Sequence, residues 1–150
     1  MIKLKESKIS DILKIKEVKL SELEQAFKVL NQLRPNLCFE EYIEIVKNMD
    51  RYQVVCLFEN EEVVSYAGFS KQANLYYGNH IWVYDLVTDE AKRGQGLGRI
   101  LLSYLEECAR ENSLNCVALS SGLARVDAHK FYEKAMNYDK VSYVFKKNLK

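Results

Sequence analysis

The residue types that could do chemistry gather first in the run KRGQGLGR at residues 92–99, where three glycines in five residues stand directly before a segment of helical character. An ordered glycine costs about 0.5–1 kcal/mol of backbone entropy, so such a cluster indicates unusual dihedral angles or a close approach of the backbone to a ligand. The first N–H groups of a helix lack internal partners, and the helix dipole places positive charge beside them, so a phosphate group could bind there. The run therefore predicts a diphosphate site, and an ordinary turn is the alternative.

Three phosphate-binding patterns compete for this loop. A P-loop needs lysine and then serine or threonine after its last glycine, and the sequence has Arg99 and Ile100 there. A dinucleotide-binding G-x-G-x-x-G fingerprint would need glycine at position 99 and a parallel sheet. The third pattern, R/Q-x-x-G-x-G/A, is filled by Arg93, Gly96 and Gly98, and here the sequence resembles the GNAT superfamily of N-acetyltransferases.

The resemblance extends over most of the chain from about residue 53 onward. The run DLVT at 85–88 stands where the superfamily has a D-L-x-V strand end, and AHKFYEK at 128–134 is similar to its A-x-x-F-Y-E-K helix. Two positions depart from the pattern: Asn137 stands where glycine usually ends that helix, and GLAR at 122–125 replaces an asparagine that touches the cofactor in many relatives. The second departure puts cofactor affinity in question, whereas asparagine tolerates the left-handed conformation that a helix end needs.

The resemblance implies an α/β fold: a single domain over residues 1–150, with a mixed, mostly antiparallel sheet that is splayed at the acyl-CoA site and flanked by about four helices. Acetyl-CoA would be the co-substrate and would lie where the strand that ends near Thr88 parts from the strand at 116–120. Its pantetheine arm would pair with backbone groups of Leu86, Val87 and Thr88. Its diphosphate would rest on the glycine loop: Arg93, Gly94, Gln95, Gly96, Leu97, Gly98 and Arg99.

Transfer of an acetyl group to an amine needs a base that takes a proton from the amine and an acid that protonates the departing thiolate. The resemblance assigns the acid to Tyr132, in the matching F-Y-E-K context, and the alternative is an ordinary aromatic residue on a helix face. Asp85 is the candidate base because it is a carboxylate on the strand beside the acyl site, although strand alternation could equally turn it toward solvent or into a structural hydrogen bond. A backbone N–H near Val87 or Thr88 would polarise the acyl carbonyl.

The elements that must position these residues follow from hydrophobic periodicity. Ser21 and Glu24 form a capping-box signature before the first helix, and ENEE at 59–62 predicts a hairpin. The segments LRPNLCF at 33–39 and NLYYGN at 74–79 are expected to line the acceptor pocket. We expect strands over 11–19, 53–58, 63–69, 79–88, 116–120 and 141–147, and helices over 23–33, 39–49, 100–111 and 128–136.

Composition limits the function classes. A chain of 150 residues that is 48% hydrophobic fits one globular domain, and a net charge of +1 gives no support for nucleic-acid binding. No apolar run is long enough for a secretory leader or a membrane span, so we expect a cytoplasmic protein with no membrane partner. No metal site is predicted. The four cysteines show no C-x-x-C pairing and are expected to fill the core; they are Cys38, Cys56, Cys108 and Cys116.

The sequence thus predicts an enzyme, an acetyl-CoA-dependent N-acetyltransferase that moves an acetyl group to a primary amine of a small molecule or peptide by direct attack. The alternative is a catalytically idle module of the same fold that binds coenzyme A for sensing or interaction. An exposed sheet edge could pair two copies into a homodimer. Neither the acceptor amine nor the acyl group follows from the loop, because the loop would read only the diphosphate.

Overall fold

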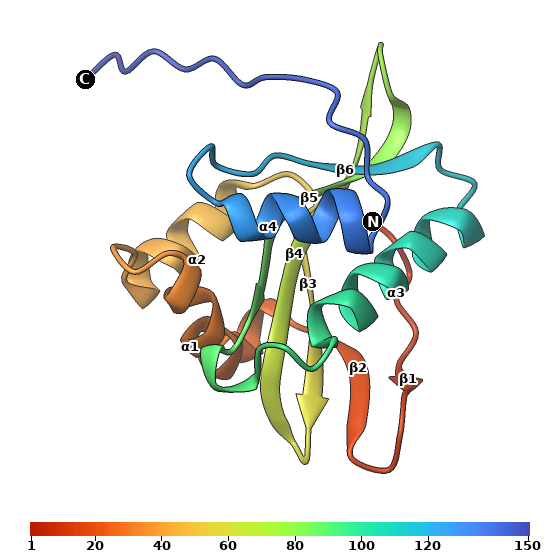
Figure 1. Cartoon of the computed structure of the whole chain (residues 1–150). Coiled ribbons are helices and arrows are strands. Elements are labelled where there is room, and N and C mark those ends of the chain that lie inside the picture. The colour runs from red at the N-terminus through yellow and green to blue at the C-terminus, as the bar shows by residue number, and fades with distance from the viewer. The chain divides into compact units, whose positions relative to one another are not determined.

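The computed structural model describes residues 1–150 in two units, residues 1–118 and 119–150, and each is described by itself. The first unit is built on an open, mixed six-stranded sheet whose strands lie in chain order, and the last strand reaches one residue into the second unit (Figure 1). From β1 to β5, neighbouring strands pair antiparallel. The strands are β1 Ser7–Lys8, β2 Leu13–Val18, β3 Gln53–Glu59, β4 Glu62–Asn74, β5 Gly78–Thr88 and β6 Cys116–Leu119.

Helices cover both faces of this sheet. Helices α1 (Glu24–Leu33) and α2 (Phe39–Asn48) pack on the face that presents Val54 and Cys56 of β3. Successive side chains of a strand alternate, so the buried Val55 and Leu57 point to the other face, where α3 packs through leucines of its own. Helix α3 spans Leu97–Glu111, and none of the helices has the length and hydropathy needed to cross a bilayer. The expected α/β architecture with a mostly antiparallel sheet is confirmed.

The hairpin predicted at residues 59–62 is confirmed. Strand β3 ends at Glu59 and β4 begins at Glu62. The two residues between them, Asn60 and Glu61, have φ values of 48° and 72°. Two central residues with positive φ make the short turn whose twist matches that of antiparallel strands.

The predicted capping box before the first helix is wrong. Ser21 lies in a short 3-10 helix, Leu20–Glu22, and Leu23 occupies the N-cap position of α1 with no side-chain hydrogen bond. Leu23 is buried in the core, so an apolar residue and not a serine stands at the start of this helix. Cys38 is exposed at the N-cap of α2 and does not fill the core, whereas Cys56 and Cys108 are buried as expected.

The second unit contains helix α4, Val126–Lys130, which continues into a π-helical turn, Phe131–Ala135. The helix predicted over 128–136 is therefore confirmed, with a widened last turn. The strand predicted over 141–147 is wrong, because residues 137–150 have no regular secondary structure. Val141, Tyr143 and Phe145 do alternate with other residues, but they are exposed. Alternation in the sequence gives a strand no partner for its backbone N–H and C=O groups.

Candidate active site

The glycine loop leaves the first backbone amides of α3 without partners inside the helix. Gly94 and Gly96 have φ values of 80° and 77°, and a Cβ atom at either position would meet no atom within 4 Å. The loop therefore uses glycine for its left-handed backbone, and it faces open space. The first hydrogen bond at the start of α3 joins the Ile100 N–H to the Gly96 carbonyl, so the N–H groups of residues 97–99 precede the helical ladder. These are the amides that the sequence predicted for a diphosphate.

Contacts to distant elements hold the start of this loop. Gln32 on α1 donates from Nε2 to Oδ1 of Asp89 at 3.2 Å, and its Oε1 accepts the backbone N–H of Glu90 at 2.9 Å. On the other side Lys92 pairs with Glu59 of β3 at 2.7 Å. Sequence reasoning missed Gln32, because no local pattern signals a contact between residues more than fifty positions apart.

The end of β5 leads directly into the loop. Residues 86–88 pair with β4, and the Thr88 carbonyl accepts a hydrogen bond from Nε of Arg93 at 3.3 Å. Strand β6 neighbours β5, and Asn115 just before it donates its backbone N–H to the Asn79 carbonyl, at the opposite end of β5 from Thr88. The structure thus brings the predicted strand end and the predicted loop together.

A β-bulge interrupts the pairing of β4 with β5 just before this strand end. Asp85 pairs with Gly68 and Val83 pairs with Phe69, so Tyr84 has no partner of its own. An unbroken strand would place Asp85 and Val83 on the same face, and the extra residue separates them.

The bulge decides the direction of Asp85, which the sequence left open. Gly68 and Tyr66 lie on one face of β4, and Tyr66 belongs to the core under α1 and α2. Because Asp85 lies directly across from Gly68, its carboxylate points to that face too. The side chain is 15% exposed, so the carboxylate lies mostly inside the protein.

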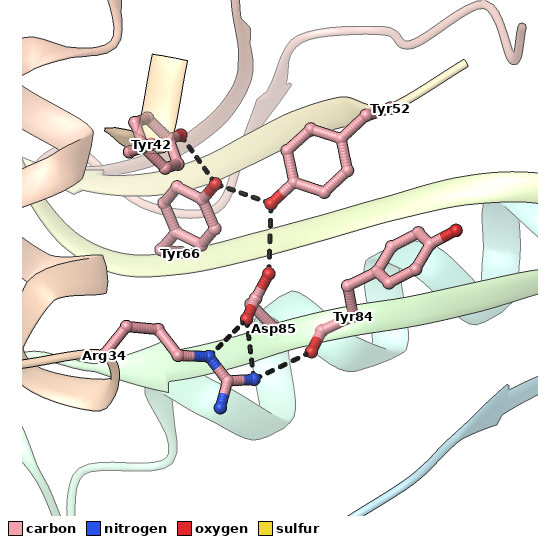
Figure 2. Close-up of polar contacts among 6 residues, drawn as sticks. All are labelled: Arg34, Tyr42, Tyr52, Tyr66, Tyr84 and Asp85. Atoms are coloured by element: carbon pink, nitrogen blue, oxygen red, sulfur yellow. Dashed lines mark hydrogen bonds and ion pairs between the residues drawn. The ribbon is translucent and has the colours of Figure 1, made fainter. Parts of the chain in front are cut away.

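The carboxylate of Asp85 lies within a continuous chain of polar contacts, between Tyr52 and Arg34 (Figure 2). Its Oδ2 accepts from the Tyr52 hydroxyl at 3.1 Å, and the hydroxyls of Tyr52 and Tyr42 each lie 2.8 Å from that of Tyr66. On the other side, Arg34 at the end of α1 approaches Oδ1 with Nε at 3.0 Å and with a terminal nitrogen at 2.8 Å. The sequence singled out Asp85 and included Arg34 in the segment 33–39 expected to line the acceptor pocket, whereas the three tyrosines, from other elements of the chain, were missed.

The chain of hydroxyls has one direction. Each phenol carries one proton, so Tyr52, which donates to Asp85, accepts from Tyr66, and Tyr66 accepts from Tyr42. Burial raises the pKa of Tyr42 to about 12. Burial first, and then the charge of Asp85, raises the pKa of Tyr52 well above its usual value. All these hydroxyls therefore stay protonated at neutral pH and orient the carboxylate.

Gly68 makes room for this arrangement. A Cβ atom at this position would overlap the hydroxyl oxygen of Tyr52 and lie 2.5 Å from its ring carbon Cζ. Tyr52 is 5% exposed and has little space to move away. The absence of a side chain at Gly68 is therefore what allows Tyr52 to reach Asp85.

We expect Gly68→Ala to lower the free energy of unfolding by about 2–4 kcal/mol, because it overpacks the site and displaces a buried, hydrogen-bonded hydroxyl. The coupling free energy between positions 68 and 52 is measured by urea unfolding of Gly68→Ala, Tyr52→Leu and the double variant. A smaller side chain at 52 removes the clash, so the double variant should lose less than the sum of the single losses. Strictly additive losses would contradict the contact.

A cavity of about 530 Å³ opens beside the carboxylate. The predicted segment 33–39 contributes residues 33–37 to its wall, but the predicted segment 74–79 contributes none. Tyr76 is exposed in the turn between β4 and β5, and Asp85 lies about 23 Å further along the strand. The lining is Leu30, Leu33, Arg34, Pro35, Asn36, Leu37, Tyr42, Ile45, Val46, Met49, Tyr52 and Asp85.

Tyr132, the predicted acid, lies in the second unit, in the π-helical turn after α4. Its carbonyl accepts the N–H of Tyr138 at 2.8 Å, and its ring stacks edge-on against Phe131. Burial raises the pKa of the Tyr132 phenol, and the positive charge of Arg125 opposes part of that shift. The phenol is therefore protonated at neutral pH, as an acid must be.

Comparison with known proteins gives one consistent result. The sequence model of the Acetyltransferase (GNAT) family matches residues 18–138. An uncharacterized N-acetyltransferase of Bacillus subtilis, YhdJ, is 34% identical over 126 residues, which are 82% of this chain and 89% of the relative. The aminoalkylphosphonate N-acetyltransferase of Salmonella typhimurium is 38% identical over 74 residues, about half of each chain. The aminoglycoside N-acetyltransferase AAC(6')-Iy, solved in complex with CoA, has a similar fold, with a TM-score of 0.78, 12% identity and coverage of 91% of this chain and 95% of that one.

Proposed function

The chain belongs to the GNAT family of acetyltransferases, and from that premise we propose that it transfers the acetyl group of acetyl-CoA to a primary amine of a small molecule or peptide by direct attack. One observation carries the proposal. The bulge in β5 turns Asp85 into the wall of an otherwise mostly apolar cavity, one residue before the strand end that leads to the glycine loop. The names of the Salmonella relative and of AAC(6')-Iy support a small amine as the acceptor.

Acetyl-CoA is the co-substrate of this N-acetyltransferase, and the residues present fit it. The loop offers open backbone amides at the start of a fifteen-residue helix, with exposed Arg93 and Arg99 beside them. We place the diphosphate on residues 93–99 and the pantetheine arm along the backbone of residues 86–88. The structure of AAC(6')-Iy, which has a similar fold, was solved in complex with CoA, and this supports CoA as a ligand of the fold.

The chemistry then needs one base, one acid and a polarised carbonyl. Asp85 takes a proton from the acceptor ammonium, directly or through water, and releases it to solvent. The free amine attacks the thioester carbonyl carbon, the N–C bond forms and the C–S bond breaks. A backbone N–H near Val87 or Thr88 stabilises the charge on the carbonyl oxygen. Tyr132 protonates the departing thiolate, and the second proton that leaves the amine restores the phenol.

We expect Tyr132→Phe to lower kcat by about tenfold to a hundredfold, because it removes the acid and keeps the ring. The affinity for acetyl-CoA should stay within about threefold, since the phenol acts on the departing sulfur. Steady-state kinetics together with calorimetry measure both quantities. Tyr143→Phe, at an exposed tyrosine in the C-terminal segment, is the matched control. An unchanged kcat would remove Tyr132 from the mechanism.

The test of the whole proposal is turnover of acetyl-CoA with a panel of primary amines, read as release of free thiol and as the mass of the product. Thiol release that depends on an amine, with an acetylated product, supports the enzyme. Tight binding of acetyl-CoA with no turnover on any amine or peptide would favour an idle module that only binds coenzyme A.

A further inference from the structure

The cavity beside Asp85 combines an apolar wall with a single pair of opposite charges. Its wall is mostly apolar, and among the residues that line it only Arg34 and Asp85 carry charge. The two charges are opposite and already paired with each other, at 2.8 Å. The cavity therefore offers one cation and one anion, side by side, at the border of an apolar chamber. The apolar lining consists of Leu30, Leu33, Pro35, Leu37, Ile45, Val46 and Met49.

The two opposite charges of the wall exclude some classes of acceptor amine. A polyamine would bring several positive charges to a wall with a single carboxylate, and Arg34 would repel them. A simple apolar amine would take Asp85 but leave the guanidinium of Arg34 without its partner. A molecule with one ammonium and one anionic group could instead replace both halves of the ion pair at once.

Resting on the proposed function, we propose that the acceptor is an apolar amino acid or its phosphonic analogue, a molecule in which the amine and an anionic group share one carbon. The ammonium would lie against Asp85, the anionic group would pair with Arg34, and the side chain would enter the apolar chamber. Because both charged groups are attached to one carbon, a single small molecule can face two protein groups that are in contact in the free enzyme. Arginine suits the second role, since its fork of N–H donors matches a carboxylate or a phosphonate.

The structure keeps Arg34 in place when Asp85 changes partner. The guanidinium also donates to the Tyr84 carbonyl at 3.3 Å, so it stays attached to β5. Its backbone is fixed by Asn31, whose Nδ2 donates to the carbonyls of Arg34 and Leu37, each at 2.9 Å. Asp85 likewise keeps its hydrogen bond from Tyr52. Arg34 is half exposed, which leaves its outer donors open to a ligand.

The reaction follows from this arrangement without a further reactant. One proton passes from the ammonium to Asp85 and then to water, the nitrogen attacks the acetyl carbonyl carbon, and the C–S bond breaks. The thiolate is protonated, and the products are the N-acetylated acid, which has lost its positive charge, and coenzyme A. The product then carries only an anion, so Asp85 is free to pair with Arg34 again and to assist release.

The test compares acceptors that differ only in the anionic group. Leucine, its phosphonic analogue, leucinamide and 3-methylbutylamine share one side chain, and methionine and phenylalanine with their amides repeat the comparison. We expect kcat/KM for the better of the two anionic acceptors to exceed that of the amide by about tenfold to a hundredfold, the worth of a charge-assisted contact. The ratio of kcat/KM for leucine to kcat/KM for its phosphonic analogue identifies which anionic group the site prefers.

Arg34→Gln tests the residue. It should lower the ratio of kcat/KM for leucine to kcat/KM for 3-methylbutylamine by about tenfold to a hundredfold, because any effect of Arg34 on Asp85 is shared by both acceptors. Arg110→Gln, at an exposed arginine near the end of α3, also removes one positive charge, but it should leave kcat/KM unchanged for both kinds of acceptor. Calorimetry of leucine against the protein saturated with coenzyme A gives a second readout, in which the heat of binding should be lost in Arg34→Gln only.

The outcomes separate this inference from the proposed function. Equal rates for the amino acids and their amides, or an equal loss for every acceptor in Arg34→Gln, would overturn the inference and leave the acetyltransferase intact. Acetylation of other amines, such as a polyamine, with no acetylation of the amino acids or the phosphonate would do the same. If acetyl-CoA itself fails to bind, the proposed function falls together with the inference.

Discussion

A variant with Gly96→Glu and Gly98→Glu should bind acetyl-CoA about a thousandfold more weakly than the native protein. Two carboxylates would stand where the diphosphate is placed, and they would replace at least two charge-assisted contacts by repulsion. Gly96 also has a φ of 77°, so a glutamate there strains the start of α3 as well. Isothermal titration with acetyl-CoA and with coenzyme A measures the loss, and we expect micromolar binding by the native protein.

Two controls separate charge from strain. Gly96→Asn tolerates a left-handed backbone better than glutamate does and adds no charge, so it should retain most of the binding. Ser103→Glu places a carboxylate at an exposed position further along α3 and should bind like the native protein. Circular dichroism and the unfolding midpoint verify that each variant is folded. Native affinity in the folded double variant would move the diphosphate away from this loop.

Asp85→Asn should lower kcat at neutral pH by about a hundredfold or more, because the amide cannot take the proton of the acceptor. Asparagine has nearly the same shape and can still accept the hydrogen bond of Tyr52. The loss of kcat therefore measures what Asp85 contributes as a base. Without a base the reaction depends on the free-amine fraction in solution. The residual rate should therefore rise about tenfold per pH unit until the acceptor amine is deprotonated, whereas the native rate should level off earlier.

The pH profile distinguishes a base from a structural carboxylate. Asp11→Asn, at an exposed aspartate in the turn between β1 and β2, removes a carboxylate outside the cavity wall and should change neither the rate nor its pH dependence. A structural role for Asp85 would instead lower the rate by the same factor at every pH and lower the unfolding free energy in parallel. That result would leave the site without a base on β5.

The sequence determined those features that depend on neighbours along the chain. The turn between β3 and β4 needs only two residues with positive φ, and the start of α3 needs only the glycine run before an amphipathic segment. Such signals lie within a few residues of one another, so a pattern predicts them. The same local logic placed Asp85 at the end of a strand and Tyr132 on a helix, whereas the role expected of Tyr132 came from the resemblance. It failed at residues 141–147, where alternation was present and a pairing partner was not.

Tertiary structure decided where Asp85 points and what surrounds it. The direction depends on a bulge at Tyr84, and a bulge is a property of two strands in register rather than of either strand alone. Its partners come from the end of α1 and from the residue before β3, as Arg34 and Tyr52, and Tyr66 in the middle of β4 in turn bonds Tyr52. These residues lie up to 51 positions from Asp85, and no local spacing relates them. The sequence thus determined the loop and the chemical type of the site residues, while only the packing of α1 and α2 against the bulged sheet formed the paired charges and the apolar chamber.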